Sequence, residues 1–425
     1  MNNIVKYILL LVFSTTLLVA CKKNEDLVPA EYHSVVLIKE NATQEVTLYT
    51  GVGEEGRFEF TILKSGSEPN AVATVEVELI SGERLKSLGF NATKQLPSNL
   101  YTIDKTTFNL DGNNRYAKGT IILKNDEITN FLQTLPTEER SNYRIALQIK
   151  SNNATVNLDK NYFILRPIFL KPEITYEVPQ KEVIVGSEGL TVDFFLTLPF
   201  NSPWDFECTV ATATGITLPS AAFTLGNSGK VLFKKGNKRS EPLHIQLKGD
   251  LVGKYTLPLK IITSTKSGIK LPSNSFIINA LCNKIPLTPT MLSTNAQEPT
   301  EGAIANLLDN NLATFFHSAW SVSIAETHHI KVNLNAEKRR FVFTYNNRQH
   351  TNGKAKVIKI LGSENGSNWF EITTINSGLP TDNGGEYTSA VIESSQPFKS
   401  LRFDVEQTQG GTKYFCMSEF AIFAK

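Results

Sequence analysis

Two short sequence motifs occur twice in this chain of 425 residues, in the same order each time. The first has the pattern Leu-Pro-Ser-x-x-aromatic-Thr and covers residues 96–102 and 218–224. The second alternates apolar with other side chains over residues 143–149 and 255–261, and a short apolar run follows each copy. Alternation with a period of two is typical of a strand that buries one face of a sheet. The repeated order predicts two copies of one β-sandwich module.

The same alternation extends through most of the chain, and polar turn clusters separate the strand-like runs. A chain of this length holds two or three domains of ordinary size. We predict an all-β fold with two tandem antiparallel β-sandwich modules, residues 31–170 and 171–283, followed by a third β-sandwich domain at residues 284–425. The first module carries an insertion at residues 126–140, which we expect to form a short helix broken at its proline.

Composition excludes several classes of protein. The 43 basic and 41 acidic residues are intermixed, so nucleic acid is not an expected partner. Of the four cysteines, Cys21 lies in the N-terminal segment, which leaves Cys208, Cys282 and Cys416. An odd number without CxxC spacing predicts neither a zinc site nor a dense disulfide framework. A single disulfide between Cys208 and Cys282 stays an open alternative.

The N-terminal segment, residues 1–20, has one lysine and then apolar runs that end at Ala20. Its apolar core is too short to span a bilayer and has the length of the core of a secretory signal. A cysteine follows directly, and this pattern resembles a bacterial lipoprotein signal, which implies acylation of Cys21 and a tether at residues 21–30. The charged residues after Cys21 resemble the surface-export signal of Bacteroidota lipoproteins, which implies an outer-membrane location facing the exterior. The alternative is an ordinary signal peptide with a chance cysteine.

The repeated modules resemble a domain of unknown function found in tandem in Bacteroidota surface lipoproteins from glycan-utilisation loci. The resemblance rests on the two repeated motifs. It implies spacers that hold the C-terminal domain away from the membrane. A second ligand surface near Trp204 is the alternative, and a buried position for Trp204 is equally open.

The last third of the chain has four of the six histidines and two of the three tryptophans. Five motifs follow one another there, at residues 308–316, 329–334, 358–369, 401–403 and 418–420. Their order resembles the discoidin domain, also called the factor V/VIII type C domain, in its carbohydrate-binding form. The resemblance implies a discoidin-like jelly-roll β-sandwich for residues 284–425, with Trp369 in its core.

Four positions depart from the family pattern. Asn310 and Asn335 stand where glycine is usual, and Asn333 and Asn365 stand where aspartate is usual. Asparagine tolerates a left-handed backbone better than most residues, so we expect the turns to form. An amide carries no charge, so a metal site built on such residues would bind its ion more weakly.

The resemblance also implies a structural calcium ion that links the opening loop to the C-terminal strand. Calcium prefers six to eight oxygen ligands. The matching residues are Asp309, Asn311, Thr314 and Glu419. The alternative is that Asp309 only caps a turn.

Aromatic faces stack on the apolar face of a sugar ring, while polar side chains bind its hydroxyl groups. We expect Trp320 and Tyr414 to stack and His317, Arg348 and Asn352 to form the hydrogen bonds. Tyr345 is expected in the same polar loop as Arg348. For each residue, a packed or purely solvated position is the alternative.

No nucleophile elbow, phosphate loop or paired-histidine zinc helix occurs, so we do not expect an enzyme. The sequence favours a surface lipoprotein that captures oligosaccharide or polysaccharide for neighbouring hydrolases and an outer-membrane transporter. Host N-glycans or mannans are the ligands that the family context favours. One alternative is an adhesin that binds a host protein or an anionic lipid surface. The other is a hydrolase hidden in the tandem modules.

Overall fold

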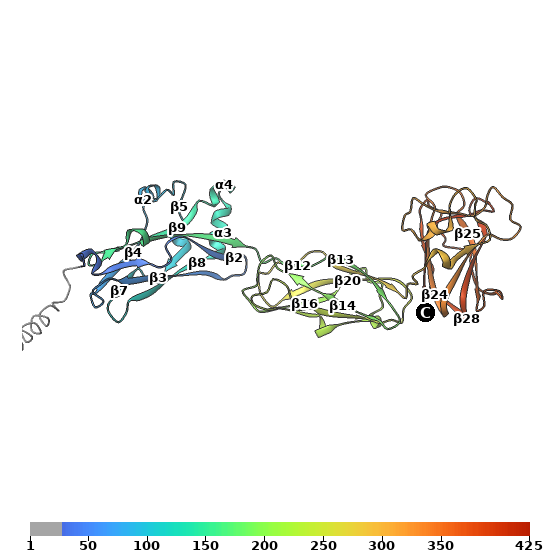
Figure 1. Ribbon diagram of the computed structural model, residues 1–425, viewed down its shortest axis with the longest axis horizontal. Coiled ribbons are helices and arrows are strands. Elements are labelled where there is room, and N and C mark those ends of the chain that lie inside the picture. The colour runs from blue at the N-terminus through green and yellow to red at the C-terminus, as the bar shows by residue number, and fades with distance from the viewer. Residues whose placement is uncertain (1–27) are drawn as a thin grey trace, which may run out of the picture. The chain divides into compact units, whose positions relative to one another are not determined.

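The computed structural model describes residues 28–425 (Figure 1). The predicted signal peptide, Cys21 and most of the predicted tether lie outside the described residues. Strands dominate, which confirms the all-β prediction. Contacts divide the described chain into two compact units, one up to residue 173 with residues 266–270, and one with residues 174–265 and 271–425. Within residues 28–425, every helix is too short or too polar to cross a membrane.

The first module consists of two facing sheets. One has the strand order β10-β1-β3-β8-β6, and the other has the order β2-β11-β9-β4-β7 with β5 beside β9. The strands are β1 (Val35–Ile38), β2 (Ala42–Tyr49), β3 (Glu55–Ser65), β4 (Ala73–Leu79), β5 (Lys94–Gln95), β6 (Tyr101–Ile103), β7 (Thr107–Leu110), β8 (Tyr116–Lys124), β9 (Tyr143–Ser151), β10 (Thr155–Val156) and β11 (Tyr162–Leu170). Besides α2 (Gly82–Ser87), the insertion forms α3 (Asn125–Gln133) and α4 (Thr137–Arg140), and Pro136 separates these two helices as predicted.

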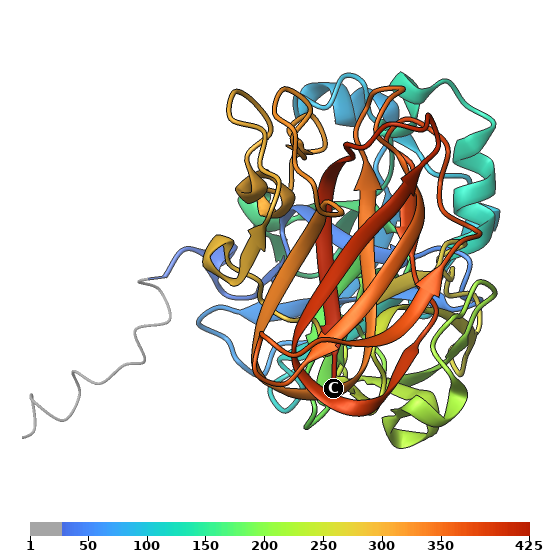
Figure 2. The same cartoon turned by 90° about the vertical axis from the view of Figure 1, so that its right-hand side faces the viewer.

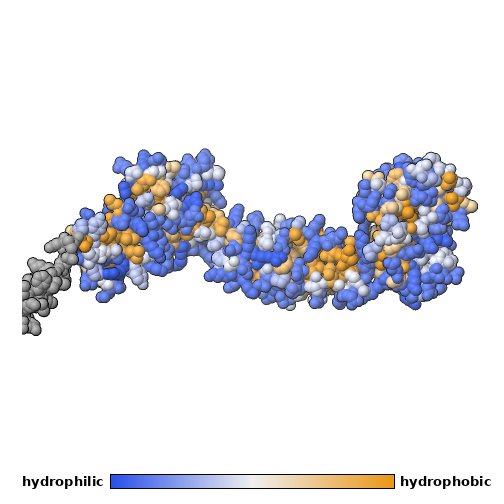
Figure 3. All heavy atoms as spheres, viewed as in Figure 1, coloured by the Kyte–Doolittle hydropathy of each residue, from blue (hydrophilic) through white to orange (hydrophobic). Residues whose placement is uncertain are grey.

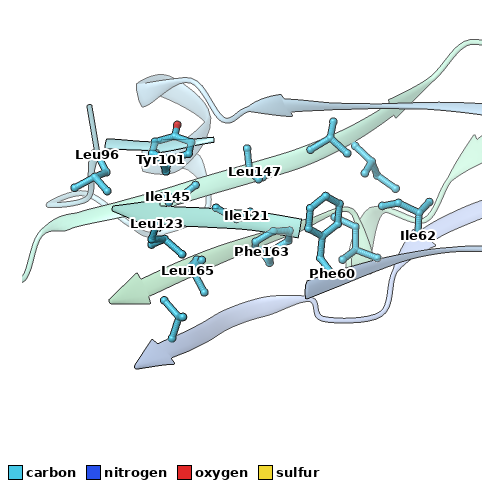
Figure 4. Close-up of a cluster of buried hydrophobic side chains, with 14 of the residues drawn as sticks. Phe60, Ile62, Leu96, Tyr101, Ile121, Leu123, Ile145, Leu147, Phe163 and Leu165 are labelled. Atoms are coloured by element: carbon cyan, nitrogen blue, oxygen red, sulfur yellow. The ribbon is translucent and has the colours of Figure 1, made fainter. Parts of the chain in front are cut away.

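The core of this module lies between its two sheets (Figure 4). The rings of Phe60 and Phe163 have centroids 5.5 Å apart, and Phe108 meets Phe60 edge-on at 5.9 Å. All three rings are fully buried. Gly119 of β8 faces them, because a Cβ atom there would lie 2.4 Å from Cζ of Phe60. Close packing of this kind leaves no room for a larger residue at position 119.

The second module repeats the topology of the first. Its strands are β12 (Thr175–Tyr176), β13 (Gln180–Val185), β14 (Leu190–Phe194), β15 (Leu196–Thr197), β16 (Phe206–Thr212), β17 (Phe223–Leu225), β18 (Lys230–Phe233), β19 (Leu243–Leu247), β20 (Gly253–Ser264) and β21 (Phe276–Cys282). The order β13-β21-β20-β16-β18 matches β2-β11-β9-β4-β7, and β14-β19-β17 matches β3-β8-β6. This match confirms the predicted repeat.

The sheets of both modules are not purely antiparallel, which corrects the prediction. The last strand of each module runs parallel to an early one, β11 beside β2 and β21 beside β13. The other long pairs are antiparallel. A parallel pair needs a long connection, and here nearly a whole module connects the two strands. The alternation of apolar and polar residues along a single strand does not indicate whether its neighbour runs parallel or antiparallel to it.

The repeated Leu-Pro-Ser motif has one structure in both modules. Pro97 and Pro219 precede short 3₁₀ turns with ψ of 133° and 139°, and the next strands begin at Tyr101 and Phe223. The fixed φ of proline suits this entry into a helical turn. The prediction from the repeated motif is therefore confirmed at the level of the backbone.

The three C-terminal cysteines are free thiols buried in the fold. Cys208 lies opposite Ser264 on the neighbouring strand β20, and Cys282 lies opposite Gly253 at the other end of β20. Eleven residues along a strand span roughly 36 Å, whereas the two Cα atoms of a disulfide lie about 4–7 Å apart. The Cys208–Cys282 disulfide left open by the sequence does not form.

The C-terminal domain is built on one sheet with the order β23-β29-β24-β28-β25-β26, to which β22 and β27 add beside β24. Its strands are β22 (Leu292–Thr294), β23 (Phe316–His317), β24 (His329–Asn347), β25 (Ala355–Ser363), β26 (Phe370–Ile375), β27 (Glu386–Thr388), β28 (Ile392–Thr408) and β29 (Cys416–Ala424). β24 pairs with β28 in its first half and with β29 in its second. The register of the β24–β28 pair is irregular between residues 333 and 340, just before the pairing with β29 begins. Figure 2 shows these long strands side by side, with loops gathered beyond their upper end.

Candidate functional site

Ser318 fastens two segments at the loop end of the C-terminal domain. Its N–H donates to the carbonyl oxygen of Phe415 at 3.0 Å, and its hydroxyl oxygen accepts from the N–H of Phe415 at 2.8 Å. The same hydroxyl lies 3.0 Å from Nδ1 of His328. Because Ser318 is fully buried, these bonds fix the segment after β23 beside the segment before β29.

This fastening brings together three of the residues predicted to bind sugar. The rings of His317 and Tyr414 have centroids 5.0 Å apart. The guanidinium carbon of Arg348 lies 3.4 Å from the ring centroid of Phe315, which is 6.3 Å from the His317 ring. Nδ1 of His317 lies 2.7 Å from the carbonyl oxygen of Ser318, so it carries the proton and Nε2 is left as an acceptor in the neutral ring.

Trp320 stands on the same segment with its indole 55 % exposed. Its Nε1–H donates to Oε1 of Glu301 at 3.1 Å, which holds the ring in place. Glu301 lies beside His317, because the carbonyl oxygen of the next residue, Gly302, accepts the N–H of His317 at 2.9 Å. Trp320, His317, Tyr414, Arg348, Phe315 and Glu301 are called the platform below.

A buried carboxylate holds the backbone under Trp320. Glu298 is 2 % exposed, and it accepts the N–H groups of Trp320 at 2.9 Å and Ser321 at 3.0 Å. The hydroxyl groups of Ser321 and Thr300 donate to it as well, at 2.7 and 3.2 Å. Desolvation raises the pKa of Glu298, but these four hydrogen bonds to the carboxylate outweigh it and lower the pKa to about 2. Glu298 is therefore ionised at neutral pH and fixes the Trp320 turn.

Asn352 lies in the loop after Arg348 and is exposed. Within residues 28–425 no hydrogen bond or ring contact joins it to the platform. Its neighbour Gly353 packs on Cys416, whose N–H donates to the Gly353 carbonyl oxygen at 2.8 Å. The loop is thus anchored close to Tyr414, and Asn352 projects from it.

Two other sequence predictions need correction. Tyr345 is not in a polar loop, because β24 continues to Asn347 and buries Tyr345 completely beside Phe343. Burial raises the pKa of Tyr345. Trp369 is only half-buried rather than in the core, and cations of Lys331 and Arg402 lie 5.3 and 5.2 Å from its ring. The second correction reflects cation–π contacts on the outer face of the sheet.

The sequence prediction missed Glu298, Glu301 and Phe315. A signal existed for Phe315, because it is two residues from His317 and so shares a face with it in an extended segment. No comparable signal pointed to the two glutamates. Their partner Trp320 lies 22 and 19 residues further along the chain, and only the fold brings them together.

The four residues predicted to hold calcium also lie together. The Thr314 hydroxyl donates to Oδ2 of Asp309 at 2.7 Å and lies 2.8 Å from the carbonyl oxygen of Asn311. The N–H of Asn311 lies 3.0 Å from Oδ1 of Asp309 and 2.7 Å from Oε1 of Glu419. Asn310 between them has φ of 56°, the left-handed backbone expected of asparagine there.

These residues fit a calcium ion by their chemistry. Burial raises the pKa of Glu419, and the adjacent carboxylate of Asp309 raises it further. Two carboxylates that repel each other, with a hydroxyl and a carbonyl oxygen beside them, form the hard oxygen donor set that calcium prefers. Among residues 28–425 no group of three or more histidine, cysteine or acidic residues is placed to hold a metal, so a calcium ion here would depend on neutral oxygen ligands as well.

Comparison with known families agrees with this fold. Residues 292–420 match the family model described as the F5/8 type C domain, so the C-terminal domain is of the discoidin type, as predicted. A model described as an N-terminal domain matches residues 31–156. A search of curated proteins found no match.

Solved structures resemble the C-terminal domain at low identity. A Clostridium perfringens module in complex with GalNAc-β-1,3-galactose is 21 % identical, with a TM-score of 0.27, and the match covers 31 % of this chain and 94 % of that one. The family 32 carbohydrate-binding module of C. perfringens NanJ in complex with galactose is 20 % identical, with a TM-score of 0.27 and coverage of 33 % and 97 %. A two-domain protein of unknown function from Bacteroides fragilis covers 94 % of this chain and 97 % of its own at 10 % identity and a TM-score of 0.26.

Proposed function

We propose that this protein is a non-catalytic glycan-binding protein whose platform holds a sugar of an oligosaccharide or polysaccharide. The observation that carries the proposal is the exposed Trp320, fixed by Glu301 beside the rings of His317 and Tyr414, which lie 5.0 Å apart and are tilted by 37°. An aromatic face in a fixed orientation stacks on the apolar face of a sugar ring. The guanidinium of Arg348 supplies donors for its hydroxyl groups, and Nε2 of His317, a residue that is only 5 % exposed, is the proposed acceptor.

The carboxylates near the platform support binding rather than hydrolysis. A glycosidase uses two carboxyl groups on either side of the scissile bond. Glu298 is buried under four hydrogen bonds from residues 300, 320 and 321, and Glu301 holds the indole. Both carboxylates are therefore engaged in holding Trp320 and the turn that carries it.

We also propose a structural calcium ion held by Asp309, Thr314, Glu419 and the carbonyl oxygen of Asn311. Bound there, it would supply positive charge between two carboxylates and tie the loop after Leu308 to β29. The residues themselves already bring loop and strand together through the N–H of Asn311. The proposed role is one of stability, because none of these four residues belongs to the platform.

The cellular role belongs to the same proposal and rests on sequence. A lipid on Cys21 would hold the protein on the outer membrane, facing the exterior. There it would present host N-glycans or mannans to surface hydrolases and an outer-membrane transporter. The tandem modules would act as spacers in this arrangement.

The test is a glycan array probed with the intact purified protein. The array should include N-glycans, yeast mannan and oligosaccharides ending in galactose or GalNAc. Binding to one related group of glycans supports the proposal. Uniform absence of binding, with the protein folded by circular dichroism, would contradict it.

An adhesin that docks on lipid is the second candidate, because Val322 is exposed two residues after Trp320. Apolar side chains of this kind insert into membrane interfaces. The visible surface in Figure 3 is largely hydrophilic with smaller apolar patches. Sedimentation with phosphatidylserine vesicles separates the two: binding that needs Val322 would support the adhesin.

A further inference from the structure

A polar groove lies next to the platform along the chain, and none of the residues predicted to bind sugar line it. It has a volume of about 520 Å³. Its walls are residues 324–328 of the loop after Trp320 and residues 405–413, without Gly410, from the end of β28 and the loop before Tyr414. Lys356 of β25 completes the lining. The volume lies within the range of small-molecule sites, about 300–1,000 Å³.

One buried side chain presents a fixed hydrogen-bond donor to this groove. His328 is 4 % exposed, and its Nδ1 lies 3.0 Å from the Ser318 hydroxyl. That hydroxyl oxygen already accepts the N–H of Phe415, and among residues 28–425 its hydrogen has no other acceptor than Nδ1. Nε2 of His328 therefore carries the ring proton, and it has no hydrogen-bond partner within the same residues. Among residues 28–425, Nε2 is not one of the buried polar atoms that lack a partner, so it is open to the groove and a ligand atom there can accept its hydrogen bond.

The charges at the rim indicate the chemical class of that ligand. Glu326, Glu406, Lys356 and Lys413 are all exposed, and none of them forms a salt bridge within residues 28–425. Two cations and two anions give no net charge that would attract an ion. Together with the amides of Gln407 and Gln409 they offer donors and acceptors in mixture, which suits a neutral ligand rich in hydroxyl groups.

Both walls of the groove are adjacent in sequence to segments of the platform. Trp320 leads through Ser321 into the wall at residues 324–328, and Tyr414 directly follows Lys413 of the opposite wall. Ser318 links the two sides, because it bonds Phe415 on the platform segment and His328 in the groove. A chain of sugars with one residue on the platform therefore has a polar channel beside it.

We propose that the groove binds the sugar residues that follow the one held on the platform, so that the domain recognises an oligosaccharide rather than a single sugar. This inference rests on the proposed function. Oxygen atoms of the following sugar accept from Nε2 of His328, and its hydroxyl groups bind Glu406 and Lys413. Affinity then increases with the length of the ligand.

The test is calorimetry on the intact protein with two ligand series: mannose, mannobiose and mannotetraose, and galactose with GalNAc-β-1,3-galactose. We expect at least tenfold tighter binding of the longest ligand than of the monosaccharide in one series. The double variant Glu406→Ala/Lys413→Ala should lose this gain and keep the affinity for the monosaccharide. The matched control Glu364→Ala/Lys399→Ala removes two exposed charges elsewhere in the domain and should keep the gain.

A second readout locates the ligand directly. The chain has six histidines, so ¹⁵N labelling of histidine gives a simple spectrum of ring resonances. The monosaccharide should shift the His317 ring alone, and the longer ligand should shift the His328 ring as well. The proposed role of the groove would be contradicted if the double variant still bound the longer ligand more tightly, or if the His328 ring resonances did not shift at saturation. Either result would leave the proposed role of the platform unaffected. Absence of binding in both series with every ligand would count against the platform and the groove together.

Discussion

Glu298 holds the backbone turn that carries Trp320, the residue that we propose stacks on sugar. We predict that Glu298→Gln weakens glycan binding at least fivefold, because an amide cannot accept all four hydrogen bonds that position residues 320 and 321. The variant should also change how stability depends on pH. The pKa of Glu298 falls from its ordinary 4.5 to about 2 on folding. The folded state thus gains stability above pH 4.5 and loses that gain as the pH falls toward 2.

The measurement is urea unfolding of wild type and Glu298→Gln between pH 2 and 6. The difference in unfolding free energy between the two proteins should be constant above about pH 4.5 and shrink as the pH falls toward 2. Glu364→Gln, an exposed glutamate of the same domain, is the control and should match wild type throughout. Parallel curves for all three proteins would show that Glu298 has no such role.

The sequence could predict site residues only where a motif or a local pattern carried them. His317, Arg348 and Tyr414 were found through the order of family motifs, and the fold joins them through Phe315. Tyr345 was misplaced although it continues the alternation of Phe341 and Phe343, because the polar residues after it suggested an earlier end of the strand. Contacts between residues far apart in the sequence, such as Glu298 and Trp320 at a separation of 22 residues, have no local signature.

The loop after Leu308 holds the proposed calcium ligands Asp309, Asn311 and Thr314, so calcium should stabilise this element most. We predict that calcium raises the thermal unfolding temperature of the protein and that EDTA reverses the effect. An ion at 100 times its Kd stabilises by about 2.7 kcal/mol. Glu419→Gln should abolish the shift, because it removes one of the two carboxylates. The control Glu364→Gln should keep it, and an unchanged shift in Glu419→Gln would contradict the assignment.

β8 shows how closely the two sheets of the first module are packed. We predict that Gly119→Ala destabilises this module by about 1–3 kcal/mol, because its methyl group would collide with the buried ring of Phe60. Hydrogen exchange of β3 and β8 in the intact protein measures the change. Gly82→Ala is the matched control, since a Cβ there has no atom within 4 Å, and it should leave exchange unchanged. Equal hydrogen exchange in both variants would mean that the core accommodates the added methyl group at position 119, which would contradict the prediction.

At the level of elements the sequence predicted more than at the level of residues. Two motifs sufficed for the repeat, because Pro97 and Pro219 impose the same backbone turn wherever the motif occurs. The parallel pairs β2–β11 and β13–β21 could not be predicted in this way. Strand direction depends on the path of the chain between distant segments, and no residue type marks that path.

For the whole molecule, buried free cysteines predict inertness to thiol reagents. Burial raises the pKa of Cys208 to about 12, and that of Cys282 and Cys416 to about 11. The thiolate is the reactive form, so all three should resist N-ethylmaleimide at pH 8 in the native protein and react after unfolding in guanidinium. Peptide mass spectrometry reports each cysteine. A peptide that links Cys208 to Cys282 under non-reducing conditions would contradict the fold at β20.

The protein combines two β-sandwich modules with a discoidin-type domain that carries the platform. We propose that this domain binds glycan through Trp320. The direct measurement is a calorimetric titration of the intact protein with the glycan that binds best on the array. Trp320→Ala should weaken binding at least tenfold and leave the unfolding temperature unchanged, because the indole is largely exposed, whereas Val391→Ala, another exposed apolar residue of the domain, should bind like wild type. Equal affinity of Trp320→Ala and wild type would contradict the claim.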